Sequence, residues 1–326
     1  MSKSTRPAVI IPNWNGADLL RPCIDSLLAQ SMACDVIVVE NGSVDESDAI
    51  LETYGEKIVV LKQEKNLGFA GGVNIGIRYA MEHGCEYIAL FNNDAVAEPG
   101  WLGELVGALQ RHKDAGVAAS KVLLDDRQTI DAIGTCYSIF GAPFTRGHNE
   151  PDTGQYDQAD YVFGAYGCGS LYRASLLADT GLFDEDYFAY LEEDDMNFRS
   201  QLRGYRVITA PRAVIYHASG STSGRLPGFT AYQRTKNFWF LYGKNMPGWL
   251  FWKYLPLATS WFFLMFTKRL REGNIIPFLR GTATAILYAP KTIRKRRQIQ
   301  RSKRVSSSYI SSLLHHGLPI RGAKET

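Results

Sequence analysis

Short, continuous apolar runs alternate with segments of helical apolar period through the first two thirds of this 326-residue chain. Apolar runs bounded by turn residues are typical of strands buried on both faces, as in parallel sheets. The alternation predicts an α/β fold with a mostly parallel, doubly wound central sheet and flanking helices. The expected strands are 8–12, 35–39, 57–61, 87–91 and 116–122, with a helix over 18–30.

Composition narrows the class of protein. With 45% hydrophobic residues, the chain can bury a full core. Residues 1–7 are polar and basic and lead straight into a strand, without the apolar core of a signal peptide. Five cysteines form no Cys-x-x-Cys pair, which indicates a reducing compartment and argues against a zinc ribbon or a disulfide framework. They are Cys23, Cys34, Cys85, Cys136 and Cys168.

The sign of the charge changes along the chain. Residues 1–225 hold 18 Lys and Arg against 31 Asp and Glu, whereas residues 226–326 hold 18 against 2. The C-terminal part also contains a dense aromatic stretch, 249–266, followed by basic clusters at 268–271 and 291–304. This change predicts a separate C-terminal region beginning at residue 226.

The aromatic stretch has three interpretations. A membrane-spanning helix needs ~20 apolar residues, and Lys253 and Pro256 interrupt this one. A segment lying in the membrane interface fits better, because Trp and Tyr favour the headgroup level and Lys and Arg are attracted by anionic lipid. The third interpretation is a pair of ordinary core helices with a solvated basic end. The aromatics are not interleaved with basic residues, so we expect no nucleic-acid partner.

Polar side chains follow the predicted strand at 87–91, at the sheet edge where α/β proteins bind ligands. Asn92 and Asp94 leave the strand together, and oxygen ligands at this spacing can hold Mg²⁺ or Mn²⁺ with a diphosphate. His217 ends another strand-like run, 214–216, and an imidazole favours Mn²⁺. The alternatives are a polar turn and a structural histidine, since Asn and Asp are common in turns.

Two further segments open helices. The glycine-rich segment 66–74 would offer backbone N–H groups and a helix dipole to a nucleotide diphosphate. Its spacing matches neither Gly-x-Gly-x-x-Gly nor a P-loop, so neither a dinucleotide fold nor a P-loop kinase is supported. An acidic run occupies 192–195, where the helix dipole alone would favour acids.

Five motifs follow one another in a fixed order. They are Pro12-Asn13-Trp14-Asn15-Gly16, Val39-Glu40-Asn41-Gly42-Ser43-Val44-Asp45, Asn66-Leu67-Gly68-Phe69-Ala70-Gly71-Gly72-Val73-Asn74, Asn92-Asn93-Asp94 and Phe188-Ala189-Tyr190-Leu191-Glu192-Glu193-Asp194-Asp195-Met196. In this order they resemble glycosyltransferase family 2, and within it the bacterial rhamnosyltransferase branch. The resemblance covers about residues 7–245, and the order is more specific than any single motif.

The resemblance implies a GT-A fold, with a catalytic domain at 1–225 and a helical, membrane-associating region at 226–326. The nucleotide-sugar half would be 1–125 and the acceptor half 126–225. Asn92 and Asp94 match the family's Asp-x-Asp metal motif, with Asn replacing the first Asp, and His217 matches a further metal ligand. The residues implied at the nucleotide sugar are Pro12, Asn13, Asn15, Glu40, Asn66, Gly68, Asn74 and Asn93.

An inverting transfer needs a carboxylate that takes the proton of the acceptor hydroxyl, opposite the leaving diphosphate. The family's Glu-Asp-x-Asp motif places this base at Glu193, with adjacent Asp194 as the competing assignment. Mg²⁺ or Mn²⁺ would neutralise the leaving group. The segment 167–170 resembles the family's acceptor side.

The resemblance and the tail together predict an inverting, metal-dependent glycosyltransferase. It would transfer L-rhamnose from dTDP-rhamnose to a polyprenyl-diphosphate-linked saccharide in cell-surface polysaccharide synthesis. We expect a peripheral protein on the anionic, cytoplasmic face of the cell membrane. The alternatives are a transferase for another UDP- or dTDP-sugar and, because of Asn92, a non-catalytic membrane scaffold with a degenerate nucleotide-sugar fold.

Overall fold

The structure, a computed structural model, describes residues 6–218 and 226–319. Its strands are β1 Ala8–Asn13, β2 Asp35–Glu40, β3 Val59–Lys62, β4 Tyr87–Leu90, β5 Ala95–Ala97, β6 Ala115–Leu124, β7 Ile130–Ala132, β8 Thr135–Tyr137, β9 Pro143–Thr145, β10 Tyr161–Val162, β11 Ser170–Arg173 and β12 Arg206–His217. Its α-helices are α1 Ala17–Leu28, α2 Ser47–Glu52, α3 Gly68–Glu82, α4 Trp101–Arg111, α5 Ala174–Thr180, α6 Glu192–Leu202, α7 Phe229–Asn245, α8 Gly248–Arg271, α9 Ile275–Leu287, α10 Ala289–Ser302 and α11 Ser307–Leu313. Two 3₁₀ helices are η1 Gly55–Lys57 and η2 Glu185–Tyr187.

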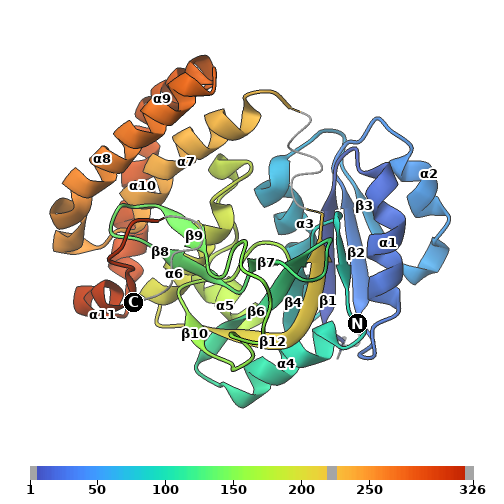
Figure 1. The fold of residues 1–326 in the computed structure, drawn as a ribbon. Helices are drawn as coiled ribbons and strands as arrows, with labels where there is room; N and C mark the ends of the chain where they lie inside the picture. Colours follow the sequence, from blue (N-terminus) through green and yellow to red (C-terminus); the bar gives the residue numbers. More distant parts are fainter. Residues whose placement is uncertain (1–5, 219–225, 320–326) are drawn as a thin grey trace.

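One central sheet runs in the order β10-β12-β6-β11-β4-β1-β2-β3, with β5 and β7 paired beside it (Figure 1). Strands β3, β2, β1 and β4 are parallel, and β12 is parallel to β6. Strand β11 is antiparallel to both β4 and β6, and so joins the two parallel groups. The five strands expected from the sequence all lie in this sheet, and the α/β class is confirmed.

Helices cover both faces of the sheet. In β1, the buried side chains of Val9 and Ile11 pack in one cluster with α1 and α4. Ala8 and Ile10, which alternate with them, pack in a second cluster with α3 and α5. This period of two is the reason why the strand is apolar throughout.

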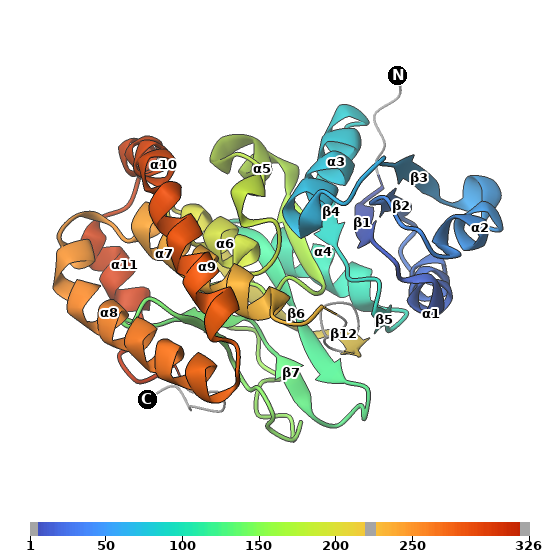
Figure 2. The same ribbon diagram turned by 90° about the horizontal axis from the view of Figure 1, so that it is seen from above.

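A third core lies between the sheet and the C-terminal helices. It joins Tyr137 and Phe198 from the first part of the chain to Tyr242, Leu250 and Ile310 from the last part. Figure 2 shows α7 to α11 grouped beside α6, on the side of the sheet opposite β3. The aromatic tail is therefore partly a core element.

The aromatic stretch forms most of one long helix. Helix α8 continues through Pro256 for 24 residues. Within the described ranges, no helix is long and apolar enough to cross a membrane. Helix α8 has both buried side chains, such as Leu250 and Tyr254, and exposed ones, such as Trp249 and Trp252.

Candidate active site

Asn13 is the centre of a hydrogen-bonded chain at the carboxyl ends of β1 and β2. The two strands are parallel, which places Asn13 beside Glu40. The Asn13 amide donates to the Glu40 carboxylate at 2.7 Å, and its oxygen accepts from the Asn93 amide at 2.8 Å. All three side chains are buried. A Cβ at Gly16 would lie 2.2 Å from the Asn93 nitrogen, so a side chain there would displace this amide.

Two loops beside this chain are tied together. Asn15, at φ 50°, accepts from the Val44 N–H at 2.8 Å, and its own N–H donates to Ser43 Oγ at 2.8 Å. Pro12 packs towards α3, since a Cβ at Gly72 would lie 3.3 Å from the Pro12 Cβ. The structure therefore brings Pro12 and Asn15 to the same sheet edge as Asn13.

The glycine-rich segment uses two of its N–H groups within the protein. Asn66 accepts from the Gly68 N–H at 2.7 Å, and the Ala70 N–H donates to the Phe188 carbonyl at 3.2 Å. Gly68 has φ +74°, and a Cβ there would lie 2.3 Å from the Phe188 oxygen, so glycine is required. The Ala70 N–H thus holds the Phe188 loop, while the Gly68 N–H bonds within its own segment. That amides of this segment face a diphosphate stays a prediction.

Asn74 is buried further along α3. Its amide donates to the Phe183 carbonyl at 2.8 Å and to Glu185 at 2.9 Å, and its oxygen accepts from the Phe183 N–H at 2.9 Å. Both ends of the side chain therefore join α3 to the segment at 183–185. That Asn74 also lies along the donor stays a prediction.

Asn92, Asp94 and His217 converge where β4 and β12 end. Strand β12 pairs with β5 and places His217 opposite Ala95. His217 Nε2 lies 3.2 Å from Asp94 Oδ1 and 3.4 Å from the Asn92 amide nitrogen. The two ends of an amide have nearly the same shape, so Asn92 can turn its oxygen to the same point.

The other face of the His217 ring is held by Asp131, on β7. His217 Nδ1 lies 2.9 Å from Asp131 Oδ2, and His148 Nδ1 lies 3.2 Å from Asp131 Oδ1. Burial raises the pKa of Asp131, but the two histidines lower it to about 2. Burial alone would lower the pKa of His217, but Cys168 and the two carboxylates raise it well above the usual histidine range.

These residues fit a divalent cation. Across residues 6–218 and 226–319, no three His, Cys, Asp or Glu side chains are grouped to hold a metal ion. Here, however, the third donor is the amide of Asn92, beside Asp94 and His217. A carboxylate behind the ring nitrogen that faces away is the arrangement usual for metal-binding histidines. Two protein oxygens and one nitrogen leave positions for a diphosphate.

The acidic run opens α6 after an unusual turn. Phe188, Tyr190 and Leu191 have φ of 65°, 70° and 69°. A side chain in this region costs about 1 to 3 kcal/mol each, so the turn must be held by its surroundings. The turn brings all four acids into the first helical turn of α6.

Asp195 has a structural role within this run. Its carboxylate accepts from Arg199 Nε and Lys244 Nζ, both at 2.9 Å, and from the Asn245 amide at 2.7 Å. Burial raises the pKa of Asp195, but Lys244 and Arg199 hold it below the usual range. A carboxylate with three such partners is a poor proton acceptor.

Glu193 has the opposite environment. One of its carboxylate oxygens is buried with no hydrogen-bond partner among the described residues, as is one oxygen of Glu192. Burial raises the pKa of Glu193, and burial together with Glu193 raises the pKa of Glu192 and of Asp194. Groups whose environments push their pKa values apart are typical of acid–base sites. The geometry therefore favours Glu193 over Asp195, with Asp194 as the neighbouring alternative.

The segment 166–168 connects the two ends of the site. The Tyr166 ring lies edge-on to His217 with centroids 6.1 Å apart, and the Cys168 thiol hydrogen-bonds the same imidazole. A Cβ at Gly167 would lie 3.5 Å from the Glu193 carboxyl carbon. The base candidate and the metal candidate thus face one short segment.

Sequence reasoning missed several residues of the site. Asp131 and His148 carry no local motif, and only the pairing of β7 beside β6 brings Asp131 to His217. Asn41 and Ser43 stand in the loop after β2, and Asn41 accepts from the N–H of Leu67 at 3.0 Å. The sequence signal that could have identified Asn41 and Ser43 is their position directly after a predicted strand.

Comparison with known proteins identifies the family. The family model "Glycosyl transferase family 2" matches residues 8–181. An uncharacterized glycosyltransferase of Rickettsia prowazekii is 30% identical over 197 residues, 59% of this chain and 57% of the relative. An N-acetylglucosaminyl-diphospho-decaprenol L-rhamnosyltransferase of Mycobacterium tuberculosis is 25% identical over 266 residues, 74% of this chain and 85% of the relative. The chain spans just over half the length of the first two curated relatives.

Solved structures confirm the fold. Staphylococcus aureus TarS 1–349 in complex with UDP-GlcNAc superposes with a TM-score of 0.57 at 16% identity, over 91% of both chains. A mannosyltransferase of Pyrobaculum calidifontis in complex with GDP-Man and Mn²⁺ superposes with a TM-score of 0.52 at 15% identity, over 94% of this chain and 78% of the other.

The sheet and these matches define the GT-A fold. The chain belongs to glycosyl transferase family 2.

Proposed function

We propose that this glycosyltransferase inverts the anomeric centre and takes L-rhamnose from dTDP-rhamnose, with a polyprenyl-diphosphate-linked saccharide as acceptor. The observation that carries the reaction type is one site with two parts. One is the group Asn92, Asp94 and His217, which could hold a metal ion, and the other is Glu193, beyond the segment 166–168, with one buried carboxylate oxygen that has no hydrogen-bond partner among the described residues. The sugar and acceptor rest on the mycobacterial relative's name and on the motif resemblance.

In this reaction the acceptor hydroxyl oxygen forms a bond to the anomeric carbon while the bond to the diphosphate breaks. Glu193 takes the hydroxyl proton, because its raised pKa and free lone pair suit a general base. Asp94, Asn92 and His217 would hold Mg²⁺ or Mn²⁺, which supplies charge stabilisation to the departing diphosphate when bound. Asp131 fixes the His217 ring so that Nε2 faces this group.

At the donor end, the Asn13, Glu40 and Asn93 chain would hold the nucleoside and sugar hydroxyls. Pro12 and Asn15 would lie beside this chain at the same sheet edge. Asn66 and Gly68 would shape the neighbouring loop before α3. Buried amides with defined partners discriminate strongly among hydroxyl patterns, since a missing hydroxyl leaves them unpaired.

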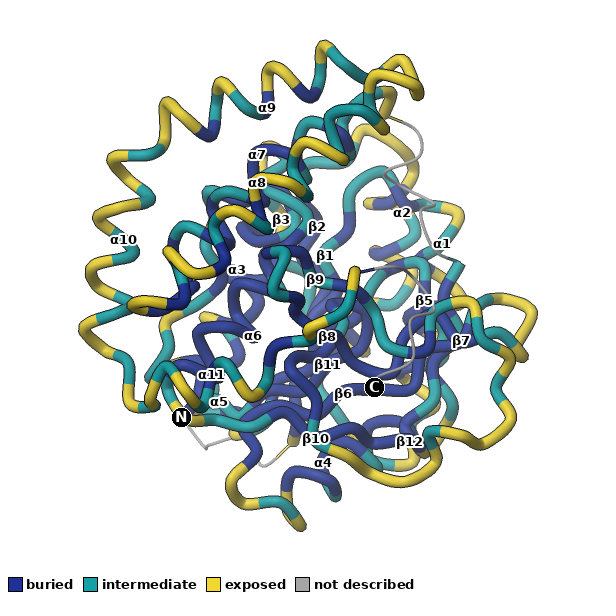
Figure 3. Tube along the Cα trace, turned by 60° about the vertical axis from the view of Figure 1, so that its left-hand side comes forward, coloured by how far each residue is buried: buried dark blue, intermediate teal, exposed yellow. Residues whose placement is uncertain are grey.

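The C-terminal helices support a peripheral place at the membrane. Of the 15 large hydrophobic side chains exposed among the described residues, 11 lie at 249–293, on α8, α9 and α10 or the turn between α9 and α10. Trp252, Ile286 and Leu287 are 71%, 68% and 77% exposed. Figure 3 shows exposed positions alternating with buried or intermediate ones along α9, and with intermediate ones along α10. Exposed basic residues on the same helices, including Lys268, Arg280 and Arg297, complement an anionic surface. We propose the cytoplasmic face.

A donor panel tests the proposal. dTDP-rhamnose, UDP-GlcNAc, UDP-glucose and GDP-mannose are compared by thermal shift with Mn²⁺, with Mg²⁺ and with EDTA, and then by nucleotide release with a polyprenyl-diphosphate-GlcNAc acceptor. The largest metal-dependent shift and the fastest release with dTDP-rhamnose are expected. A preference for a UDP-sugar would assign another donor, and binding of none would favour the scaffold alternative.

A further inference from the structure

The turn before α6 needs support from outside itself. Three of its residues, Phe188, Tyr190 and Leu191, have positive φ, and none of them is glycine. The turn leads directly into the acidic run, so its conformation fixes where the first turn of α6 points. Whatever holds the turn also positions Glu193.

Asn237, on α7, holds this turn from the C-terminal side. Its amide nitrogen donates to the carbonyls of Tyr187, Ala189 and Tyr190 at 3.1, 2.9 and 2.7 Å. The side chain is fully buried. An amide nitrogen has two hydrogens, so three carbonyls share them. All three acceptors are carbonyls, which fixes the orientation of the amide.

Lys236 adds a second set of contacts from the same helix. Its ammonium donates to the carbonyls of Asp186 and Tyr187 at 3.0 and 3.2 Å. On the opposite side, the Phe188 carbonyl accepts from the N–H of Ala70, in the first turn of α3. Hydrogen bonds from α7 and from the first turn of α3 thus hold the turn on two sides.

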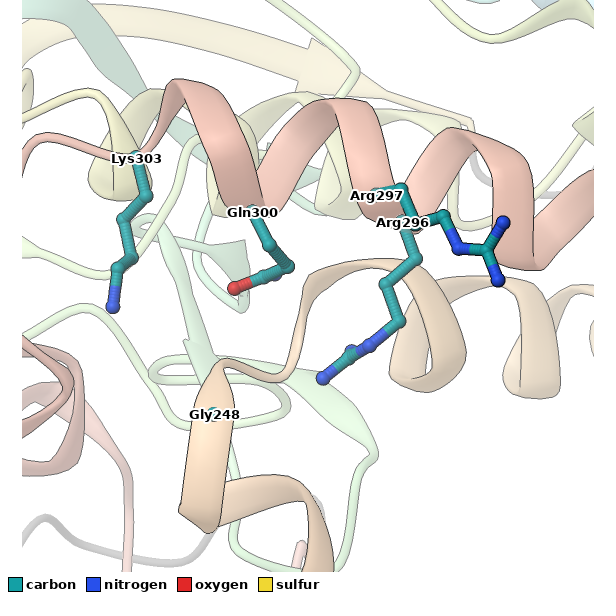
Figure 4. A pocket seen from close by; sticks show the side chains of 5 residues that line it. All are labelled: Gly248, Arg296, Arg297, Gln300 and Lys303. Carbon is teal, nitrogen blue, oxygen red and sulfur yellow. The ribbon is translucent and has the colours of Figure 1, made fainter.

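Helix α7 is itself fixed at its C-terminal end. Arg296 donates to the carbonyls of Gly243 and Met246 at 2.9 and 2.7 Å, and Gln300 donates to those of Lys244 and Asn245. Both side chains line a cavity of about 360 Å³ between α10 and the start of α8 (Figure 4). All four of these bonds go to backbone carbonyls at 243–246, so Arg296 and Gln300 hold the C-terminal end of α7.

We propose that Asn237 is a positioning residue for sugar transfer. It fixes the strained turn at 187–191 and thereby aims Glu193 at the acceptor hydroxyl. This inference rests on the proposed role of Glu193. By this proposal, the C-terminal helices contribute to sugar transfer as well as to the proposed membrane association.

The test compares Asn237→Ala with Thr235→Ala. Thr235 is equally buried on α7 and bonds Ala231 at 2.7 Å, but it packs against α9 at Gly281. For Asn237→Ala we expect kcat to fall ~10-fold or more with the donor KM within about twofold, since small displacements of reacting groups are costly. Hydrogen exchange should accelerate at amides 188–192. Thr235→Ala should lower the melting temperature while leaving kcat and these amides unchanged.

Two results would overturn the inference: an Asn237→Ala protein with the kcat of the parent, or an equal loss of kcat in Thr235→Ala. If Asn237→Ala does not fold, Asn237→Ser and Lys236→Met make smaller changes to the same contacts. If the parent protein consumes no sugar nucleotide, the proposed function fails. The exchange rates at 188–192 then still decide whether Asn237 holds the turn.

Discussion

His217 Nδ1 lies 2.9 Å from Asp131 Oδ2, while its Nε2 lies 3.2 Å from Asp94 Oδ1. One imidazole is thus held between two carboxylates, Asp131 on β7 and Asp94 in the turn between β4 and β5. Asp131 is nearly inaccessible, which suits a residue that orients the ring rather than one that meets substrate. Substitution of Asp131 therefore distinguishes best between a His217 that binds a metal ion and a His217 that is purely structural.

The first prediction is that Asp131→Asn weakens Mn²⁺-dependent nucleotide binding by ~10- to 100-fold, the range expected for loss of a carboxylate behind a metal ligand. Isothermal titration of dTDP with and without Mn²⁺ measures this. Asp125→Asn, on the exposed turn of the same segment, is the control and should bind like the parent. An equal loss of affinity in EDTA would show that Asp131 supports the fold and not a metal.

The second prediction concerns the metal ligands themselves. Asp94→Ala should abolish most metal-dependent nucleotide affinity without unfolding the protein, because Asp94 follows the end of a strand. His217→Ala should cause a smaller loss. Asn92→Asp should strengthen Mn²⁺ binding, since it adds a negative charge to a side chain whose amide nitrogen lies 3.4 Å from His217 Nε2. The measurement is nucleotide affinity across a metal titration. An Asp94→Ala protein with the affinity of the parent would show that the assignment is wrong.

The third prediction identifies the base. Glu193→Gln preserves shape and removes proton affinity, so transfer should fall by ~10²-fold or more while the donor still binds. Asp195→Asn should instead lower the melting temperature, because Lys244 and Arg199 lose their buried partner. Initial rates and thermal shift on both variants, with Asp194→Asn beside them, give the answer. An inactive Asp194→Asn with an active Glu193→Gln would move the base by one residue.

The strands were predictable because each is a continuous apolar run, and 87–91 became β4 with Asn92 and Asp94 at its end. The acidic helix start was also visible. Asp131 was not, because a single acid in the three-residue strand β7 has no periodicity and reaches His217 only through sheet pairing 86 residues apart. Asn237 was hidden for the same reason: its partners are backbone carbonyls nearly 50 residues away.

The fourth prediction follows from the raised pKa of Glu192, which burial and Glu193 produce. A folded-state pKa above the unfolded value contributes stability that is present below the unfolded pKa, near 4.3, and is lost as pH rises through the folded pKa. Glu192→Gln mimics the protonated acid, so it should raise the melting temperature at pH 8 and change it little at pH 4. Thermal melts of the metal-free protein across this range measure it. A variant less stable than the parent at pH 8 would show that the carboxylate is ionised and favourably paired.

The last prediction concerns the membrane face. Deleting α8 to α11 would remove Leu250 and Ile310 from the core, so point substitutions are the proper test. Trp252→Ser combined with Ile286→Ser and Leu287→Ser should reduce flotation with vesicles containing phosphatidylglycerol, and leave donor binding unchanged.

Leu28→Ser, at an exposed apolar position on α1, is the matched control for this triple variant and should float like the parent. For the parent, 1 M salt should release part of the protein, because the Debye length falls to ~3 Å and the basic attraction weakens while apolar burial persists. Retention on neutral vesicles equal to that on anionic ones would remove the electrostatic contribution. Failure of the parent to float on either would leave the exposed side chains of α8 to α10 without a lipid role.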